Sequence, residues 1–305
     1  MRALVTGGTG FVGSHVARAL IESGHEVRIL HRASSKLTTL EGVLFESAIG
    51  DILDRESLRA ACQGCDWVFH VAAIADYWRA DQSRMFEANV EGTRRVLEAS
   101  REAGVKRVIF TSSAAAIGIL PGQSSSESVA FNLSPSHFPY GYSKVLAERV
   151  VQDAVAVGQD VITLNPGVVM GPGDLNMISG SFITQIRQFG ILTPMTNGGV
   201  GVVDVRDVAR WQVLAAEKGI SGERYILSTA NYSYQDWFAM IADTVGVSRP
   251  ILTVPAFILP LAAWVIDILR RYGISTPVDA DQVRLGGRYV YFDTTKTWSA
   301  FGKPQ

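Results

Sequence analysis

Two side chains in the stretch YGYSK have the types and the spacing for acid-base chemistry. Tyr140 and Lys144 stand four residues apart near the start of a predicted helix, 140–157, so the phenol and the ammonium share one helix face. A nearby cation favours the phenolate and lowers the pKa of a tyrosine from its ordinary value of about 10. We therefore expect Tyr140 to exchange protons near neutral pH.

Two adjacent hydroxyl groups end a strand-like run in the stretch FTSSAAAIG. Ser112 and Ser113 stand at the carboxyl end of this predicted strand, which is the edge where a parallel sheet exposes its ligands. A hydroxyl there could hold the carbonyl oxygen of a substrate while Tyr140 gives that oxygen a proton. An isolated Tyr-x-x-x-Lys pair is usually a solvated helix face, but its position one helix after the two serines favours catalysis.

A glycine-rich turn near the N-terminus, TGGTGFVG, indicates a dinucleotide site. Gly8, Gly10 and Gly13 fit G-x-G-x-x-G, whereas Gly7, Gly10 and Gly13 fit the wider G-x-x-G-x-x-G. The turn joins an apolar run to an amphipathic helix, so its backbone N–H groups could hold a pyrophosphate at the positive helix end. The residues alone leave both glycine spacings open.

The elements that must position these residues alternate between strands and helices, as in a doubly wound parallel sheet. The runs are continuously apolar, which is typical of parallel strands buried on both faces. We expect strands at 2–6, 26–32, 43–48, 67–73, 107–113 and 161–165, and helices at 11–22, 84–102 and 140–157. This α/β pattern assigns 1–170 to a Rossmann-type domain, with 201–228 packing back on it, and 171–305 to a smaller, interleaved substrate lobe.

Taken together, these stretches resemble the extended short-chain dehydrogenase/reductases over nearly the whole chain. The likeness is greatest to the dihydroflavonol 4-reductase-like and hopanoid-associated sugar epimerase-like branches. It rests on TGGTGFVG, GDILD, HVAA, NVEGT, FTSSA, YGYSK and NPGVVMGPGD. The resemblance implies a catalytic triad of Ser113, Tyr140 and Lys144, in which Lys144 also holds the nicotinamide ribose and tunes the tyrosine.

The resemblance also implies how the chain would hold an NAD(P) cofactor. It selects the wider glycine spacing for the phosphates, two residues beside the adenine, small residues along the groove and a segment beside the nicotinamide. A helix asparagine would steady the site. The implied residues are Gly7, Thr9, Gly10, Phe11, Val12, Gly13, Asp51, Ile52, Ala72, Ala73, Asn89, Ser112, Pro166, Gly167, Val168 and Val169.

The residues after the second predicted strand favour NADP over NAD. An NAD site generally places a carboxylate there for the ribose 2′-hydroxyl, whereas this chain reads LHRASSK. Arg32 could stack on adenine and reach a 2′-phosphate, with Ser34, Ser35 and Lys36 as further donors. We therefore expect NADP(H), with NAD(H) as the alternative; the simplest structural alternative is a solvated Arg32.

The predicted reaction is hydride transfer between the nicotinamide and a ketone or secondary alcohol. The resembled family also contains sugar-nucleotide 4-epimerases with the same triad, and relatives that sense dinucleotides without catalysis, so both stay open. Ala114 and Ala115 stand where the related 4,6-dehydratases carry an acidic pair, which argues against elimination.

Indications of the substrate point in two directions. Tyr77 and Trp78 follow the fourth predicted strand and could form an aromatic wall for a flat or apolar substrate, or pack beneath the smaller lobe. Asn165 precedes a proline, as in sugar epimerases of the family, which favours a sugar nucleotide. A second diphosphate would need a basic pair, for which the candidates are Arg187, Arg206 and Arg224.

Composition limits the remaining possibilities. The 305 residues carry a net charge of −1 with scattered basic side chains, so we expect no nucleic-acid partner and no metal site. Cys62 and Cys65 form a C-x-x-C without a second ligand pair, which favours core packing over redox or zinc chemistry. A core strand directly after Met1, with only two cysteines, predicts a cytoplasmic location.

The most apolar stretch, 254–273, is interrupted by Pro260 and Asp267, so we expect no membrane span there. A helix on the smaller lobe is the first expectation, and a surface that collects an apolar substrate or touches a membrane is the second. We also expect the helices near 84 and 140 to pair in a homodimer. Relatives commonly continue past the final WSAFGKPQ into another helix, which leaves a shortened chain as one interpretation.

Overall fold

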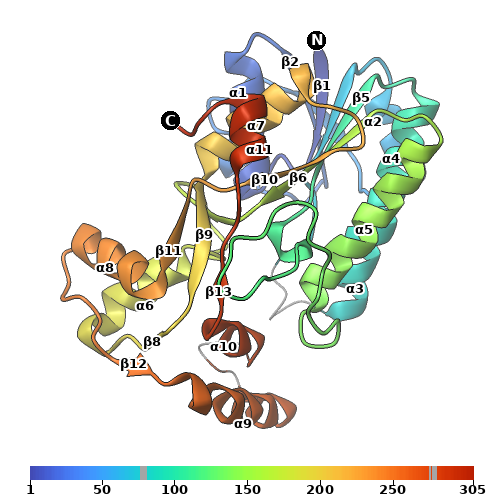
Figure 1. The fold of residues 1–305 in the computed structure, drawn as a ribbon. Helices are drawn as coiled ribbons and strands as arrows, with labels where there is room; N and C mark the ends of the chain where they lie inside the picture. The colour runs from blue at the N-terminus through green and yellow to red at the C-terminus, as the bar shows by residue number, and fades with distance from the viewer. Residues whose placement is uncertain (76–80, 275, 277–279) are drawn as a thin grey trace.

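The computed structural model describes residues 1–75, 81–274, 276 and 280–305. Its centre is a sheet of seven parallel strands in the order β10-β6-β5-β4-β1-β2-β3 (Figure 1). The strands are β1 Arg2–Thr6, β2 Glu26–His31, β3 Glu46–Ile49, β4 Trp67–His70, β5 Arg107–Thr111, β6 Val161–Pro166 and β10 Arg224–Leu227. After β3 the chain crosses back over the sheet and places β4 on the other side of β1, so the strand order reverses there. This is the doubly wound α/β sheet that the sequence predicts.

Helices cover both faces of this sheet. One face carries α1 Phe11–Glu22, α7 Val205–Lys218 and α11 Thr295–Phe301, and the other carries α2 Arg55–Cys62, α4 Gly92–Glu102 and α5 Pro139–Ala156 (Figure 1). Successive side chains of β1 enter different cores, because Ala3 and Val5 pack on the first side and Leu4 on the second. Burial on both faces explains why the inner strands read as continuous apolar runs. The edge strand β3 is mostly exposed and begins at Glu46, three residues after the start of the predicted strand 43–48.

The predicted helix at 84–102 is composed of three pieces. It begins as α3 Gln82–Phe86, widens into a π-helical turn at Glu87–Glu91 and continues as α4. Asp81 caps its start by accepting a hydrogen bond from the backbone N–H of Arg84 at 3.1 Å. A π turn inserts an extra residue into the helix and often occurs at functional sites.

In its described residues, the smaller lobe is built on a short mixed sheet and four α-helices. Its strands are β7 Val168–Met170, β9 Gly199–Asp204, β11 Ala230–Ser233 and β13 Tyr289–Val290, with a separate pair of β8 Met195–Thr196 and β12 Thr253–Val254. Its helices are α6 Ser181–Phe189, α8 Tyr234–Val245, α9 Leu259–Arg271 and α10 Ala280–Gly286. Aromatic rings form its core, since Phe182 lies 4.9 Å from Trp237 and 6.0 Å from Phe238 between centroids.

Short 3₁₀ turns connect several of these elements. They are η1 Thr38–Leu40, η3 Ala114–Ala116, η4 Gly190–Leu192 and η5 Ala256–Ile258.

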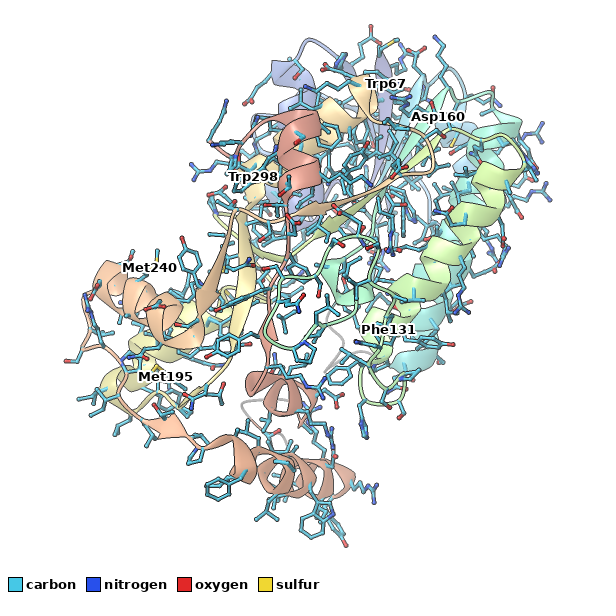
Figure 2. The ribbon with its side chains drawn as sticks, in the orientation of Figure 1. Trp67, Phe131, Asp160, Met195, Met240 and Trp298 are labelled. Carbon is cyan, nitrogen blue, oxygen red and sulfur yellow. The ribbon has the colours of Figure 1, made fainter. Side chains whose placement is uncertain are left out.

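The chain returns from the smaller lobe to the central sheet twice. The first return brings α7 and β10 back, within the range 201–228 that the sequence predicts. The second brings α11, whose Thr297 hydroxyl donates to the carbonyl of Ile226 at 2.7 Å and whose Phe301 ring lies 4.7 Å from that of Tyr225. Figure 2 shows Trp298 on this helix. Residues 295–305 therefore pack on the larger domain, because Phe301 is buried there, and not on the substrate lobe.

Cys62 and Cys65 are free thiols buried at the end of α2. Burial raises the pKa of Cys62 to about 11, which keeps the thiol protonated and unreactive near neutral pH. Within the described ranges, no cluster of three metal-ligating side chains occurs. No helix of that part of the chain combines the length and the apolar character that a bilayer crossing requires.

Candidate active site

A cavity of about 1540 Å³ lies between the central sheet and the smaller lobe. One half of its wall comes from the segments that follow β1, β2, β3, β4, β5 and β6. The other half comes from α6, α8, α9 and α10. The carboxyl edge of a doubly wound sheet is where such folds bind their ligands.

The glycine turn after β1 forms one end of this cavity. Gly7 has a φ of 71°, and a Cβ there would lie 2.7 Å from the backbone nitrogen of Ala72. A Cβ on Gly13 would overlap the carbonyl oxygen of Gly7, and Gly10 begins α1 by donating its N–H to that oxygen at 2.9 Å. Gly8 instead packs on Ile29 in the core, so only the glycines of the wider spacing line the cavity.

Most of the other predicted cofactor residues also line the cavity. They are Thr9, Phe11, Val12, Arg32, Asp51, Ile52, Ala72, Ala73, Ser112, Pro166, Gly167, Val168 and Val169. These residues fit a dinucleotide. Backbone N–H groups at the start of α1 could bind its phosphates, in a space that a Cβ on Gly7 or Gly13 would occupy, and the exposed Arg32 could bind its ribose end.

Five predicted residues are placed off the cavity wall or are not described. Lys36 is exposed and does not belong to the cavity wall, because the chain turns away after Ser35. Asn89 is buried behind the wall, where its side chain bonds the backbone of Ile74 and the hydroxyl of Ser143. This agrees with a steadying role and not with cofactor contact. Tyr77 and Trp78 lie outside the described residues.

Asn165 is fully buried and does not reach the cavity wall. Its side-chain amide donates to the carbonyl of Ser113 at 2.9 Å and to Glu148 Oε1 at 2.6 Å. The structure therefore does not bring Asn165 to a substrate as the sequence suggested. It supports the backbone of Ser113 instead.

Ser113 and Tyr140 meet at the cavity wall. A side-chain hydrogen bond joins them, and Ser113 Oγ also accepts the backbone N–H of Ala115 at 3.2 Å. Tyr140 stands in the first turn of α5, which begins with Pro139 where a missing N–H has no cost. Removal from water raises the pKa of Tyr140, and the hydrogen bond with Ser113 partly offsets this rise.

Lys144 follows one turn later and is 2 % exposed. Its ammonium donates to the carbonyl of Thr111 at 3.0 Å and lies 5.3 Å from the centroid of the Phe110 ring. Burial lowers the pKa of Lys144 to about 8, and the negative charge of Glu148 opposes that decrease. The expectation that the pKa of Tyr140 lies below its ordinary value is wrong for this structure, because desolvation of the phenol dominates and its pKa rises.

Glu148 is the functional candidate that the sequence analysis missed. Its Oε1 accepts hydrogen bonds from Ser112 Oγ at 2.5 Å and from Asn165, and its Oε2 pairs with Arg224 of β10 at 2.8 Å. Tyr140, Lys144 and Glu148 recur every four residues on one face of α5, and that spacing is the signal that could have revealed it.

A buried histidine supports the other side of the site. His70 at the end of β4 bonds Thr6 Oγ1 at 2.8 Å and Thr93 Oγ1 at 3.0 Å through its two ring nitrogens. Burial lowers its pKa to about 3, so the ring is neutral near pH 7. Thr93 Oγ1 also bonds the carbonyl of Asn89, which links the histidine to the π turn.

The half of the cavity in the smaller lobe is mainly apolar and aromatic, with polar side chains that include Asp174, Gln185 and Asp281. Among the described lining residues, the cations are Arg32, Arg84 and Lys144, and all three belong to the larger domain. None of the three arginines that the sequence suggested for a second diphosphate, Arg187, Arg206 and Arg224, lines the cavity. Arg206 forms an ion pair with Asp204, and Arg224 forms one with Glu148. The apolar lining residues of this half include Phe182, Ile186, Phe189, Leu192, Met195, Trp237, Phe238, Leu259, Ala262 and Ile266.

Comparison with known proteins identifies the family. The model of the NAD dependent epimerase/dehydratase family matches residues 3–228. The chain belongs to this family. Its relatives are reductases, dehydratases and epimerases of the extended short-chain dehydrogenase/reductase type, so the chain is an enzyme of that type, as the sequence predicts.

Two relatives and one solved structure illustrate the likeness. A protein provisionally named dihydroflavonol 4-reductase from Synechocystis sp. is 36% identical over 310 residues, which cover 99% of this chain and 89% of that protein. Sterol demethylase protein B from Methylococcus capsulatus is 34% identical, covering 89% of this chain and 83% of its own. A dTDP-glucose 4,6-dehydratase double mutant from Streptomyces venezuelae, solved with NAD, has a TM-score of 0.79 at 25% identity, covering 100% and 92%.

Proposed function

We propose that the chain is an NADP(H)-dependent reductase that interconverts an apolar ketone and its secondary alcohol through Ser113, Tyr140 and Lys144. The observation that carries this proposal is the composition of one cavity. The triad and the glycine turn share its larger-domain wall, while the facing wall is mainly apolar, includes the acids Asp174 and Asp281, and holds no cation among the described lining residues. A carbonyl compound without a second diphosphate fits that wall.

The triad residues would divide the work of reduction as follows. The bound reduced nicotinamide supplies hydride to the carbonyl carbon. Ser113 donates a hydrogen bond to the carbonyl oxygen, and the Tyr140 phenol gives its proton to that oxygen as negative charge develops there. The raised pKa of Tyr140 suits this direction, because the phenol stays protonated near neutral pH. Lys144, as a buried cation, stabilises the tyrosinate that remains until solvent returns the proton.

The cofactor preference rests on Arg32. Its exposed guanidinium lies at the cavity rim beyond β2, and no carboxylate stands between His31 and Lys36. A guanidinium binds a 2′-phosphate in a bidentate manner, whereas an NAD site uses an acid for the 2′-hydroxyl. We therefore favour NADP(H) over NAD(H).

The names of the relatives support an apolar carbonyl substrate. One is named for a flavonoid reductase and another for sterol processing, and both substrates named there are polycyclic. Ala114 and Ala115 after the triad serine offer no acid for elimination, which separates this chain from a 4,6-dehydratase.

The second candidate is a sugar-nucleotide 4-epimerase with the same triad. The dehydratase neighbour, named for a sugar nucleotide, is the observation that favours it. An epimerase regenerates its own cofactor and has no need to exchange it, whereas a reductase must release NADP after each turnover. A sensor that binds the dinucleotide without catalysis is a third, weaker candidate, because the triad is complete.

The first experiment is to denature freshly purified protein and identify by mass the nucleotide that it releases. We expect empty protein that binds NADPH more tightly than NADH, and then reduction of at least one member of a panel of polycyclic and aromatic ketones. The Tyr140→Phe variant should bind NADPH unchanged and lose on the order of a hundredfold or more in turnover. Near-stoichiometric bound NAD would favour the epimerase and overturn the proposal.

A further inference from the structure

Helix α9 and its neighbours carry an unusual concentration of exposed apolar side chains. Of the 23 large hydrophobic residues that are exposed in the described part of the chain, eleven fall in η4 or in residues 251–274. Ile251 joins the two segments by donating its N–H to the carbonyl of Ile191 at 3.3 Å. We call this set the α9 surface; it consists of Ile191, Leu192, Ile251, Leu252, Phe257, Ile258, Leu261, Trp264, Val265, Tyr272 and Ile274.

The helix is apolar on two opposite sides. On its inner side, Leu259 and Ala263 are buried, and Ala262 and Ile266 line the cavity. On its outer side, Leu261 and Trp264 are 61 % and 58 % exposed. A helix that is apolar all round is normally covered on both sides. The outer side of α9 therefore needs a partner that the described chain does not supply.

The α9 surface faces away from the rest of the molecule. Figure 1 shows α9 at the end of the molecule opposite β2 and α2, and Figure 2 shows side chains on its outer side that point outward. The helix has 13 residues and is therefore about 20 Å long, too short to cross a bilayer but long enough to lie on one.

The charges and aromatic residues of this surface match the headgroup region of a membrane. Arg270 and Arg271 occupy the last turn of α9, and its one acid, Asp267, is paired with Arg284. Exposed Trp264 and Tyr272 have the amphipathic rings that favour a bilayer interface. An anionic headgroup would neutralise Arg271, whereas an apolar helix face would enter the acyl boundary.

A second copy of the chain fits this surface less well. A two-fold copy would present the same residues, and the stretch 251–266 contains no acid to pair with Arg271. The inner side of α9 is a wall of the cavity, so a partner on its outer side is separated from the cavity by this one helix.

We propose that the α9 surface binds the interface of an anionic phospholipid bilayer and holds the cavity against it. A bilayer in that place could deliver an apolar substrate to the cavity. Only this delivery rests on the proposed reductase function. Binding itself does not depend on catalysis, so the two proposals are tested separately.

The test is flotation of the full chain with vesicles of phosphatidylcholine and phosphatidylglycerol, compared with vesicles of phosphatidylcholine alone. We expect the wild type to float with the mixed vesicles. The double variant Phe257→Ser/Trp264→Ser should lose on the order of tenfold or more in bound fraction, and Arg271→Glu should lose binding to the anionic vesicles selectively. Leu44→Ser is the matched control, because Leu44 and Phe257 are both 83 % exposed and Leu44 lies outside the α9 surface.

The design also separates misfolding, self-association and failure of the proposed function. Each variant must keep the wild-type melting temperature and NADPH affinity, so that lost flotation reports on the surface. A wild type that stays in the soluble fraction with both vesicle types overturns the proposal. So does a double variant that sediments at a lower mass than the wild type without lipid, because a second copy then covers α9. Flotation without ketone reduction would sustain the membrane proposal and reject the reductase.

Discussion

Glu148 and Asn165 meet in the buried layer behind the triad, where Glu148 Oε1 accepts a hydrogen bond from Asn165 Nδ2 at 2.6 Å. The same amide donates to the carbonyl of Ser113, so the carboxylate reaches the triad serine through a single side chain. On the other side, Glu148 pairs with Arg224 of β10. This buried charge therefore supports the position of Ser113 and also opposes the decrease that burial causes in the pKa of Lys144.

Glu148→Gln should shift the pH dependence of reduction. Lys144 has a pKa of about 8, so wild-type activity should fall as the pH rises through that value and the ammonium loses its proton. Glutamine removes the negative charge that raises this pKa, and the alkaline limb should move to lower pH by about one unit. The measurement is kcat against pH with saturating NADPH and ketone.

Arg224→Gln is the matched control for this shift. It breaks the ion pair at Glu148 but leaves the carboxylate beside Lys144, so the alkaline limb should stay in place or move to higher pH. Both variants lose the ion pair and should lose stability by a few kcal/mol. Equal downward shifts in the two variants would show that Glu148 acts only through structure.

Arg32→Ala should weaken NADPH binding and leave NADH binding nearly unchanged. Loss of a charge-assisted contact to the 2′-phosphate corresponds to about 1.5–3 kcal/mol, or roughly tenfold to more than a hundredfold in Kd. Lys36→Ala removes an exposed cation off the cavity wall and should change either Kd less than about twofold. Titration of cofactor fluorescence measures the Kd of NADPH and of NADH for the wild type and both variants. If Lys36→Ala is as severe as Arg32→Ala, the assignment of the 2′-phosphate site is incorrect.

His70 should make the folded state sensitive to mild acid. Its pKa is lowered to about 3 in the folded chain, whereas the unfolded chain has the ordinary value near 6.5. Below pH 6.5 the unfolded state binds a proton that the folded state does not, so stability falls as the pH falls, by up to about 1.4 kcal/mol per unit toward pH 3. Urea unfolding of the wild type and His70→Gln at several pH values checks this: the variant should have the shallower pH dependence.

We expect a homodimer in which α3, α4 and α5 pair with their copies about a two-fold axis. The half-buried Leu146 lies on the outer stripe of α5, where a new carboxylate would be buried at such an interface. Leu146→Glu should therefore convert the dimer to a monomer in sedimentation velocity at micromolar concentration. A wild type of monomeric mass would refute the interface.

Sequence patterns predicted the central sheet well, because parallel strands buried on both faces are continuous apolar runs. β10 was less visible, since RYIL is only four residues long and begins with an arginine. The π turn around Asn89 could not be predicted either, because its residues fit an ordinary helix and its contact with Ser143 of α5 joins segments far apart in the sequence.

The candidate site was predictable where the backbone dictates residue type. Glycines at a tight turn can be read from their spacing, and the structure brings the wider set to the cavity. The pKa of Tyr140 was not predictable, because it depends on how strongly the phenol is desolvated and on where the Lys144 ammonium points. Asn165 illustrates the same limit, since its position at a strand end does not reveal whether the amide faces the cavity or Glu148.

The final segment of the chain also affects how the protein can be made. Phe301 joins a core formed by α1, α7 and strands of the central sheet, Thr297 bonds the carbonyl of Ile226, and Trp211 donates its indole N–H to the carbonyl of Gly302 at 3.1 Å. During synthesis these residues emerge after the whole substrate lobe. The larger domain, although its first strands precede that lobe, therefore cannot complete its packing until the lobe has been synthesised.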